Sequence, residues 1–188
     1  MKVIVIVDMQ NDFINGSLGT QEARDILPVM VKRLRAYESE QPLVLFTKDT
    51  HSGDYMDTQE GKNLPVPHCI EGTTGWSICK SISSVVDYNS NFLFYSDDSI
   101  IRSRIHKNTF GSVRLAEIIN EYEDEFEEVI FMGVCTDICV ASNALLVKAY
   151  CPELKITVDA SCCAGTTPAN HMAALQVMKS CQINVIGE

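Results

Sequence analysis

The chain has 188 residues, of which 46% are hydrophobic, and a formal net charge of −10. A single domain of this length buries about 70% of the surface that its unfolded chain exposes, so it can form a core without disulfide bonds. The acidic balance disfavours nucleic acid and anionic membranes, because both need a basic protein surface. We therefore expect neither as a partner.

The eight cysteines are expected to be reduced. Met1 and Lys2 lead directly into the short apolar run Val3 to Val7, which is too short for a secretory signal or a membrane span. Cys162 and Cys163 are adjacent, a poor arrangement for an ordinary disulfide. Both observations favour a cytoplasmic location, where thiols stay reduced.

Strand-like and helical patterns alternate along the chain. Continuous apolar runs, typical of strands buried on both faces, lie at 2–7, 42–47, 91–96, 128–133, 155–158 and 182–186. Helical patterns lie at 23–39, 112–123, 137–150 and 168–180. This alternation predicts one α/β domain over residues 1–188, with three α/β/α layers around a mainly parallel six-stranded sheet.

Residues 49–75 interrupt this rhythm. The segment has no clear periodicity and is rich in glycine and proline, at positions Gly53, Gly61, Pro65, Pro67, Gly72 and Gly75. Loops of this length in a compact domain are usually functional or disordered. We therefore interpret the segment as a candidate binding loop.

Cys139 follows the predicted strand at 128–133 and lies at the start of a helical stretch. A helix N-terminus favours thiolate over thiol and lowers the pKa of a cysteine. Cysteine is also a common small buried hydrophobe, and we adopt that interpretation for most of the other seven. Cys139 is the predicted nucleophile.

Asp8 ends the first predicted strand, and Lys107 lies after a weakly patterned stretch that can reach the same crevice. Ligands of open parallel sheets bind at the carboxyl ends of the strands, where Cys139 is also expected. A carboxylate can take the thiol proton, and an ammonium can stabilise the thiolate. The alternatives are a turn-capping role for Asp8 and a surface position for Lys107.

A second cluster is predicted within the loop. Asp49 and His51 stand two residues apart, and His68 follows across the glycine-rich stretch. One carboxylate and two imidazoles suit a divalent transition metal such as zinc, iron or manganese, with positions left for water or substrate. A lone loop histidine is more often a surface residue, but the Asp-x-His pair with a distant histidine favours a metal site.

Several separated motifs give the chain a resemblance to the isochorismatase-like cysteine hydrolases over essentially its whole length. The motifs are Asp8-Met9-Gln10-Asn11-Asp12-Phe13, Thr47-Lys48-Asp49-Thr50-His51, Pro67-His68-Cys69-Ile70-Glu71-Gly72-Thr73, Lys107 with Phe110 and Ser112, and Gly133 to Val140. The resemblance implies a catalytic triad of Asp8, Lys107 and Cys139 and metal ligands Asp49, His51 and His68.

The resemblance also implies details of backbone and substrate binding. The peptide bond between Val134 and Cys135 matches the family's cis bond, which would place the amide of Cys135 beside that of Cys139 as an oxyanion hole. Phe13 is the candidate for stacking on a substrate ring. Tyr55 stands where some members carry a further metal-binding histidine, and the segment Leu64 to His68 lacks the tryptophan that many members place before Pro-x-His.

The Asp-x-His and histidine set favours the nicotinamidase branch, because metal-free relatives generally lack it. The implied activity is hydrolysis of nicotinamide to nicotinate and ammonia through a Cys139 thioester, as a step of NAD salvage. The resemblance also implies one divalent metal ion, with zinc as the first candidate. The alternatives are another small amide or isochorismate as substrate, a non-catalytic binding protein on this fold, and a thiol redox protein. A redox role is disfavoured because no Cys-x-x-Cys pair occurs. A homo-oligomer remains open.

Overall fold

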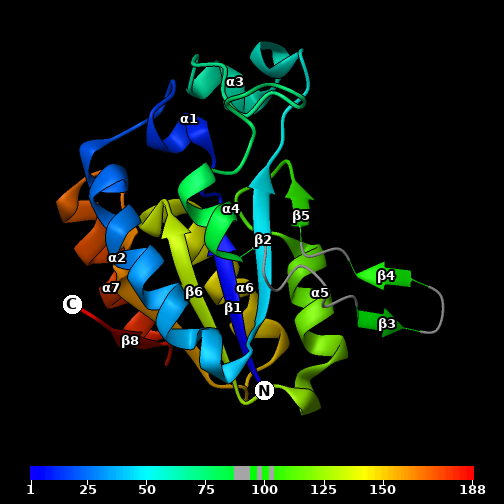
Figure 1. Cartoon of the computed structure of the whole chain (residues 1–188). Helices are drawn as coiled ribbons and strands as arrows, with labels where there is room; N and C mark the ends of the chain where they lie inside the picture. The colour runs from blue at the N-terminus through cyan, green and yellow to red at the C-terminus, as the bar shows by residue number, and fades with distance from the viewer. Residues whose placement is uncertain (87–93, 97–98, 102–103) are drawn as a thin grey trace.

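The computed structural model describes residues 1–86, 94–96, 99–101 and 104–188 (Figure 1). Its centre is a six-stranded, wholly parallel sheet in the order β5-β2-β1-β6-β7-β8. Its strands are β1 (Lys2–Val7), β2 (Leu43–Asp49), β5 (Arg104–Lys107), β6 (Glu128–Val134), β7 (Ile156–Ala164) and β8 (Asn184–Ile186).

Helices cover both faces of this sheet, which confirms the predicted three-layer α/β/α architecture. The helices are α1 (Asn11–Ile14), α2 (Gln21–Tyr37), α3 (Gln59–Asn63), α4 (Lys80–Val86), α5 (Val113–Glu121), α6 (Ala141–Tyr150) and α7 (Pro168–Ser180). Apolar side chains of α5, α6 and α7 share one core with the sheet, and those of α1, α2 and α4 share the other. No helix in the described ranges is long and apolar enough to cross a membrane.

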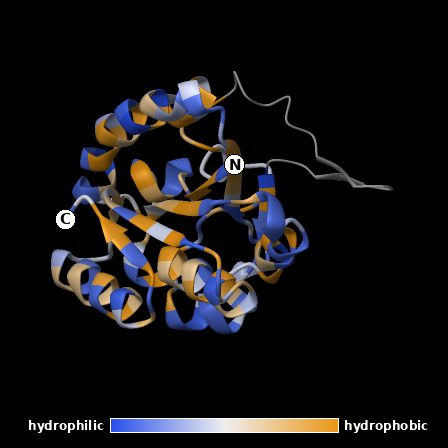
Figure 2. Ribbon diagram, turned by 90° about the horizontal axis from the view of Figure 1, so that it is seen from below, coloured by the Kyte–Doolittle hydropathy of each residue, from blue (hydrophilic) through white to orange (hydrophobic). Residues whose placement is uncertain are grey.

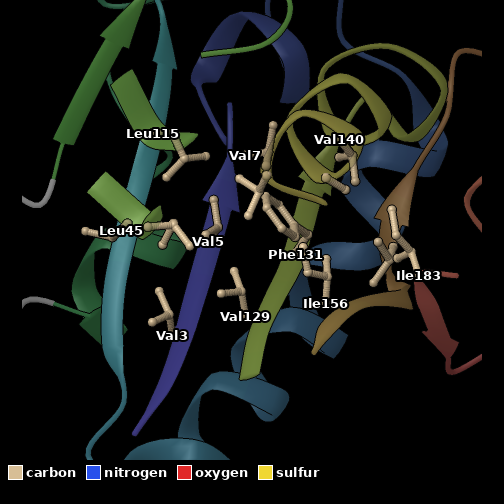
Figure 3. Close-up of a cluster of buried hydrophobic side chains, with 14 of the residues drawn as sticks. Val3, Val5, Val7, Leu45, Leu115, Val129, Phe131, Val140, Ile156 and Ile183 are labelled. Atoms are coloured by element: carbon tan, nitrogen blue, oxygen red, sulfur yellow. The ribbon is translucent and has the colours of Figure 1, made fainter. Parts of the chain in front are cut away.

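Strand β1 shows why the sheet is central. Val3, Val5 and Val7 enter the core beneath α5 and α6, whereas Ile4 and Ile6 enter the opposite one, and all five are fully buried. Figure 3 shows the valines beside Leu45 of β2 and Val129 and Phe131 of β6. Burying each such side chain contributes about 1.5–3 kcal/mol, so this run is stable only as an interior strand.

Among the surrounding helices, α2 and α5 are clearly amphipathic, and α2, α5 and α7 begin with a side-chain cap. In Figure 2 the central strands are mostly hydrophobic (orange), while the outer helices carry both hydrophobic and hydrophilic (blue) residues. The side chains of Thr20, Ser112 and Thr167 accept hydrogen bonds from Ala23, Leu115 and Asn170 N–H at the starts of α2, α5 and α7. These caps satisfy backbone groups that the first helical turn leaves unpaired.

The strand order creates a crevice at the carboxyl ends of β1 and β6. The chain builds outward from β1 to β2 and β5, then returns to the other side of β1 with β6. This is the switch point where open α/β sheets bind ligands. Gly133 has φ 132° there, and a Cβ on it would lie 2.1 Å from the Val7 carbonyl oxygen, so only glycine lets β6 approach β1 this closely.

Two element predictions were wrong. The predicted sheet strand at 91–96 falls partly outside the described residues, and its described part, β3 (Phe94–Ser96), pairs with β4 (Ser99–Ile101) in a separate antiparallel sheet. The sixth strand of the main sheet is β5, whose burial alternates because it lies at the edge. The helix expected from residue 137 begins as a π-helical turn, η5 (Thr136–Val140), before α6.

Candidate active site and metal centre

The three residues predicted to form a catalytic triad meet at the β1–β6 crevice. Lys107 Nζ lies 2.6 Å from Asp8 Oδ2 and 3.6 Å from Cys139 Sγ. Their exposed fractions are 5% for Lys107, 0% for Asp8 and 7% for Cys139. An anion, a cation and a thiol are therefore in contact and withdrawn from water.

The backbone conformation of Asp8 and a hydrogen bond from β2 orient its side chain in the crevice. Its φ is 50°, in the left-handed region that aspartate tolerates better than most residues. Thr47 Oγ1 donates a 2.7 Å hydrogen bond to Asp8 Oδ1, which leaves Oδ2 for Lys107. The two oxygens of Asp8 thus have different partners, and the carboxylate is fixed in one orientation.

Lys107 connects this cluster to the predicted metal ligands. It is the last residue of β5 and pairs in register with Asp49, the last residue of β2. Its Nζ lies 3.6 Å from Asp49 Oδ1. One ammonium therefore contacts the carboxylates of both clusters, as well as the thiol.

Burial sets the protonation of this cluster. It raises the pKa of Asp8, and the nearby Lys107 ammonium opposes that rise. Burial alone would lower the pKa of Lys107, but Asp8 and Cys139 raise it above its usual range. Burial, reinforced by the Asp8 carboxylate, raises the pKa of the Cys139 thiol well above its usual range.

The prediction of a lowered Cys139 pKa was therefore wrong. The helix-terminus argument considered only the backbone, whereas desolvation and a neighbouring anion dominate at a residue this deeply buried. The resting group is a thiol. An adjacent base must take its proton before the sulfur can attack, and Asp8 is the carboxylate within the cluster.

Cys139 lies on η5 rather than on a regular α-helix. Val140 N–H donates to the Cys135 carbonyl across five residues, at 3.0 Å, and Ile138 N–H donates to the same oxygen at 3.1 Å. The Val134–Cys135 peptide bond is cis. The turn that begins at this bond places residues 135 and 139 at the same end of the crevice.

Asn143 ties this turn to the segment that follows Lys107. Its amide nitrogen donates to the carbonyls of Cys139, at 2.7 Å, and Phe110, at 3.1 Å, and its Oδ1 accepts from Ser112 N–H at 2.9 Å. Asn143 is fully buried. It joins three backbone groups of two segments that are distant in the sequence, and no sequence pattern identified it.

A second clamp reaches η5 from α7. The fully buried Thr136 hydroxyl lies 2.8 Å from His171 Nδ1. Asp137 accepts hydrogen bonds from the backbone and hydroxyl of Thr166, the N–H bond at 2.8 Å. Both contacts join the start of η5 to the loop and first turn of α7.

The three predicted metal ligands form a buried cluster in which the candidate donor atoms lie within 4.8 Å of one another. His51 Nε2 and His68 Nε2 lie 3.0 and 3.3 Å from Asp49 Oδ2. His68 Nδ1 lies 2.8 Å from the Val66 carbonyl, a contact that orients the ring and directs Nε2 to the cluster. One carboxylate oxygen and two imidazole nitrogens fit a divalent metal ion.

Gln10 holds Asp49 in place. Its Oε1 accepts from Asp49 N–H at 2.7 Å, and its Nε2 donates to the Asp49 carbonyl at 2.8 Å and the Trp76 carbonyl at 2.9 Å. Burial alone would raise the pKa of Asp49, but hydrogen bonds from His51 and His68 hold it below its usual range. Asp49 is therefore ionised, as a metal ligand must be.

Glu60 of α3 is a fourth candidate ligand at this cluster, and its second carboxylate, that sequence reasoning missed. Its Oε1 lies 3.8 Å from both His51 Nε2 and His68 Nε2. Tyr55 packs against the same two imidazoles, with ring centroids 4.7 and 5.0 Å away, but its hydroxyl donates to the Leu64 carbonyl. At the position of the family's further histidine, Tyr55 therefore offers no ligand atom to the cluster, and Glu60 is the additional group that approaches both imidazoles.

Phe13, the predicted ring-stacking residue, lies beside the metal cluster. Its ring contacts His68 edge-on at a centroid distance of 5.6 Å, and it is 9% exposed. A cavity of about 880 Å³ borders the cluster, and His51 and Tyr55 form part of its wall together with Ile138, the neighbour of Cys139.

The open parallel sheet, with a buried carboxylate, ammonium and thiol at its switch point, has the architecture of a hydrolytic enzyme. The chain matches the family described as Isochorismatase domain over residues 2–187, and it belongs to that family. The family assignment confirms the resemblance noted from the sequence motifs.

Curated and structural relatives agree with this assignment. The chain is 25% identical to the nicotinamidase/pyrazinamidase of Mycobacterium tuberculosis, over 99% of this chain and 98% of the relative. A nicotinamidase/pyrazinamidase structure from Bacillus subtilis has a TM-score of 0.78 at 26% identity, over 98% of each chain. The pyrazinamidase of Pyrococcus horikoshii, solved with zinc, has a TM-score of 0.75 at 23% identity, over 100% of this chain and 99% of that one.

Proposed function

We propose that the protein is an amidohydrolase that converts nicotinamide to nicotinate and ammonia through a thioester on Cys139, with a role in NAD salvage. One observation carries the proposal: Lys107 Nζ contacts Asp8, Cys139 and Asp49 within 3.6 Å. It thereby joins a nucleophile and base to a metal-binding carboxylate. The named relatives supply the amide as substrate class.

In the first half-reaction Asp8 takes the proton of the Cys139 thiol, and the sulfur attacks the carboxamide carbon. Lys107 keeps Asp8 ionised before attack and stabilises negative charge on the sulfur. The oxyanion is bound by the backbone N–H groups of Cys135 and Cys139, and one such donor contributes roughly 3–4 kcal/mol in other acyl-transfer enzymes. The C–N bond then breaks, and Asp8 gives its proton to the departing ammonia.

In the second half-reaction water attacks the thioester carbonyl. Asp8, now ionised again, takes a proton from the water and returns it to the Cys139 sulfur as the C–S bond breaks. The products are nicotinate and ammonium, and the thiol is restored. The raised pKa of the thiol favours this return, because the resting cysteine is protonated.

Asp49, His51 and His68 would hold one divalent metal ion, and Glu60 lies close enough to add a carboxylate through water or a small side-chain movement. Zinc suits this donor set, as iron and manganese also do. When bound, the ion supplies a Lewis-acidic position for the pyridine nitrogen. Phe13 would pack against the ring, a contact worth about 0.5–1.5 kcal/mol.

The test is ammonia release by purified, zinc-loaded protein given nicotinamide, benzamide or isochorismate. The proposal predicts turnover of nicotinamide with kcat/KM well above that of benzamide, which has the same carboxamide but no ring nitrogen. Phe13→Ala should raise KM for nicotinamide while ammonia release continues. Pyruvate release from isochorismate without ammonia release from nicotinamide would replace the proposal with the isochorismate alternative.

A further inference from the structure

We infer that the cavity beside the metal centre is a substituent pocket: the enzyme accepts aromatic carboxamides whose ring carries a neutral or cationic, partly apolar substituent, and it discriminates against anionic ones. This inference rests on the proposed function and names the substrate class of the same site. It follows from the size, position and charge of the cavity.

Size is the first observation. The cavity measures about 880 Å³ and joins the metal cluster through His51 and the nucleophile's turn through Ile138. Cavities of roughly 300–1,000 Å³ hold drug-sized ligands, whereas a single-ring carboxamide fills only a small part of that volume. With the ring nitrogen at the metal cluster and the carboxamide at Cys139, the remaining ring edge is free to carry a substituent.

The walls offer apolar contact in two places. Phe110, between β5 and α5, and Leu64, at the end of α3, both line the cavity, and they are 49% and 38% exposed. Large apolar side chains that remain this exposed inside a concave surface gain free energy when a ligand covers them. A substituent with an apolar part is therefore favoured over a purely polar one.

Charge gives the selectivity. Glu60 and Glu71 line the cavity, and the lining residues that the structure describes include no Lys or Arg. The backbone of Glu71 is fixed beside that of His51, because its N–H donates to the His51 carbonyl at 2.8 Å. With a net charge of −10 on the whole chain, this concave surface attracts cations and repels carboxylates and phosphates.

The same charge acts on the products. Hydrolysis converts a neutral carboxamide into a carboxylate anion and ammonium, so the group that must leave carries the charge that the cavity repels. Isochorismate carries two carboxylates and is disfavoured for the same reason.

Equilibrium binding to the zinc-loaded Cys139→Ala variant tests the pocket without turnover. The probes are nicotinamide and three derivatives of similar length, with a butyl, 3-aminopropyl or 2-carboxyethyl group, placed on ring carbon 5 in one series and ring carbon 6 in another. In at least one series the butyl and aminopropyl compounds should bind as tightly as nicotinamide or more tightly. The carboxyethyl compound should bind about tenfold more weakly than the butyl compound.

Two substitutions identify the walls responsible. Glu71→Gln in the Cys139→Ala background should reduce the butyl-to-carboxyethyl ratio by about threefold, and Phe110→Ala should weaken the butyl compound. The matched controls are Glu117→Gln and Val113→Ala, exposed residues of α5 that do not line the cavity. Both controls should leave all affinities unchanged.

The inference is overturned if every substituted compound in both series binds more than about tenfold more weakly than nicotinamide, or if the carboxyethyl compound binds as tightly as the butyl one. Failure of the proposed function looks different, because nicotinamide itself would then be neither bound nor hydrolysed. Binding of the butyl compounds in that case would still support the pocket, and binding of none of the probes would end both proposals.

Discussion

Lys107 Nζ lies 2.6 Å from Asp8 Oδ2, and the two side chains are 2% and 0% exposed. Burying either ion alone would cost several kcal/mol of lost hydration, and the attraction between the two ions offsets that cost only while they stay in contact. The pair is also in contact with the Cys139 thiol. Its geometry therefore affects both the stability of the fold and the protonation of the nucleophile.

Lys107→Met should lower both the stability of the fold and the rate of catalysis. Asp8 would be left buried without its cation, and breaking a buried pair in this way costs about 3–5 kcal/mol. Its pKa would rise further, so less of the base would be ionised and kcat should fall by about 10²-fold or more. Urea unfolding and ammonia release measure the two effects.

Arg114→Met is the matched control, because Arg114 and its partner Glu117, 3.6 Å apart on α5, are 54% and 49% exposed. An exposed pair contributes at most about 1 kcal/mol, and turnover should be unaffected. Equal losses of stability in the two variants would show that burial does not distinguish the pairs. Normal kcat in Lys107→Met would remove Lys107 from the catalytic cluster.

Asn143→Ala should lower kcat by about tenfold or more while KM changes little. The substitution releases the carbonyl of Cys139 from the segment after Lys107, and small displacements of a nucleophile are costly in rate. Asn170→Ala, which removes an exposed amide contact with Thr166, is the control and should retain activity. If the Asn143 variant is folded by circular dichroism and kcat is normal, the clamp has no role in positioning Cys139.

His51→Ala should abolish metal binding, and Glu60→Gln should weaken it by about 10- to 100-fold if the carboxylate supports the centre through water. Asp57→Asn, in the same loop but outside the cluster, should bind metal normally. The metal content of each variant after dialysis against increasing concentrations of a chelator ranks the variants by metal affinity. Unchanged affinity in Glu60→Gln would mean that its 3.8 Å approach to both histidines is incidental.

The partial burial of His171 should make stability depend on pH. Burial lowers the pKa of His171, while Asp137 and Glu188 oppose that shift less strongly. Between this lowered pKa and the unfolded value of about 6.5, the unfolded chain binds more protons at this position. The free energy of unfolding should therefore decrease as pH falls through that window.

His171→Gln lacks this titration, so its Tm should decrease less than that of the parent protein between pH 7.5 and pH 5. All other titrating groups are common to both chains, which makes the difference between the two curves specific to His171. Parallel curves would show that His171 does not titrate differently in the folded and unfolded states.

Local patterns were enough to predict most of the architecture. β1 (Lys2–Val7) and α7 (Pro168–Ser180) have the predicted bounds, because a continuous apolar run and a Thr-Pro start determine them locally. β5 carries Lys107 but reads poorly as a strand, since an edge strand needs apolar residues on only one face. β7 extends six residues beyond the predicted end at 158, through a run of small and polar residues.

The site was predictable where one strand end fixes one residue. Asp8, Asp49 and Cys139 follow from that rule, and the structure brings them together with Lys107. Contacts between distant segments were not predictable. The Gln10 amide recognises the Asp49 backbone 39 residues away, and Glu60 reaches the two histidines only because α3 folds over them.

The raised pKa of Cys139 has the same origin. The position of a cysteine after a strand indicates a helix start but not the depth of burial, and burial decides the protonation of the thiol. A base beside the sulfur is then required for catalysis. The central claim is therefore that Cys139, and no other of the eight cysteines, carries the acyl group.

Mass spectrometry of the zinc-loaded protein, quenched in acid during turnover of nicotinamide, tests this claim most directly. The account predicts a nicotinoyl adduct that maps to the peptide containing Cys139, disappears in Cys139→Ala together with ammonia release, and persists in Cys135→Ala, where the backbone amide is kept. An adduct on another residue, or ammonia release by Cys139→Ala, would contradict it.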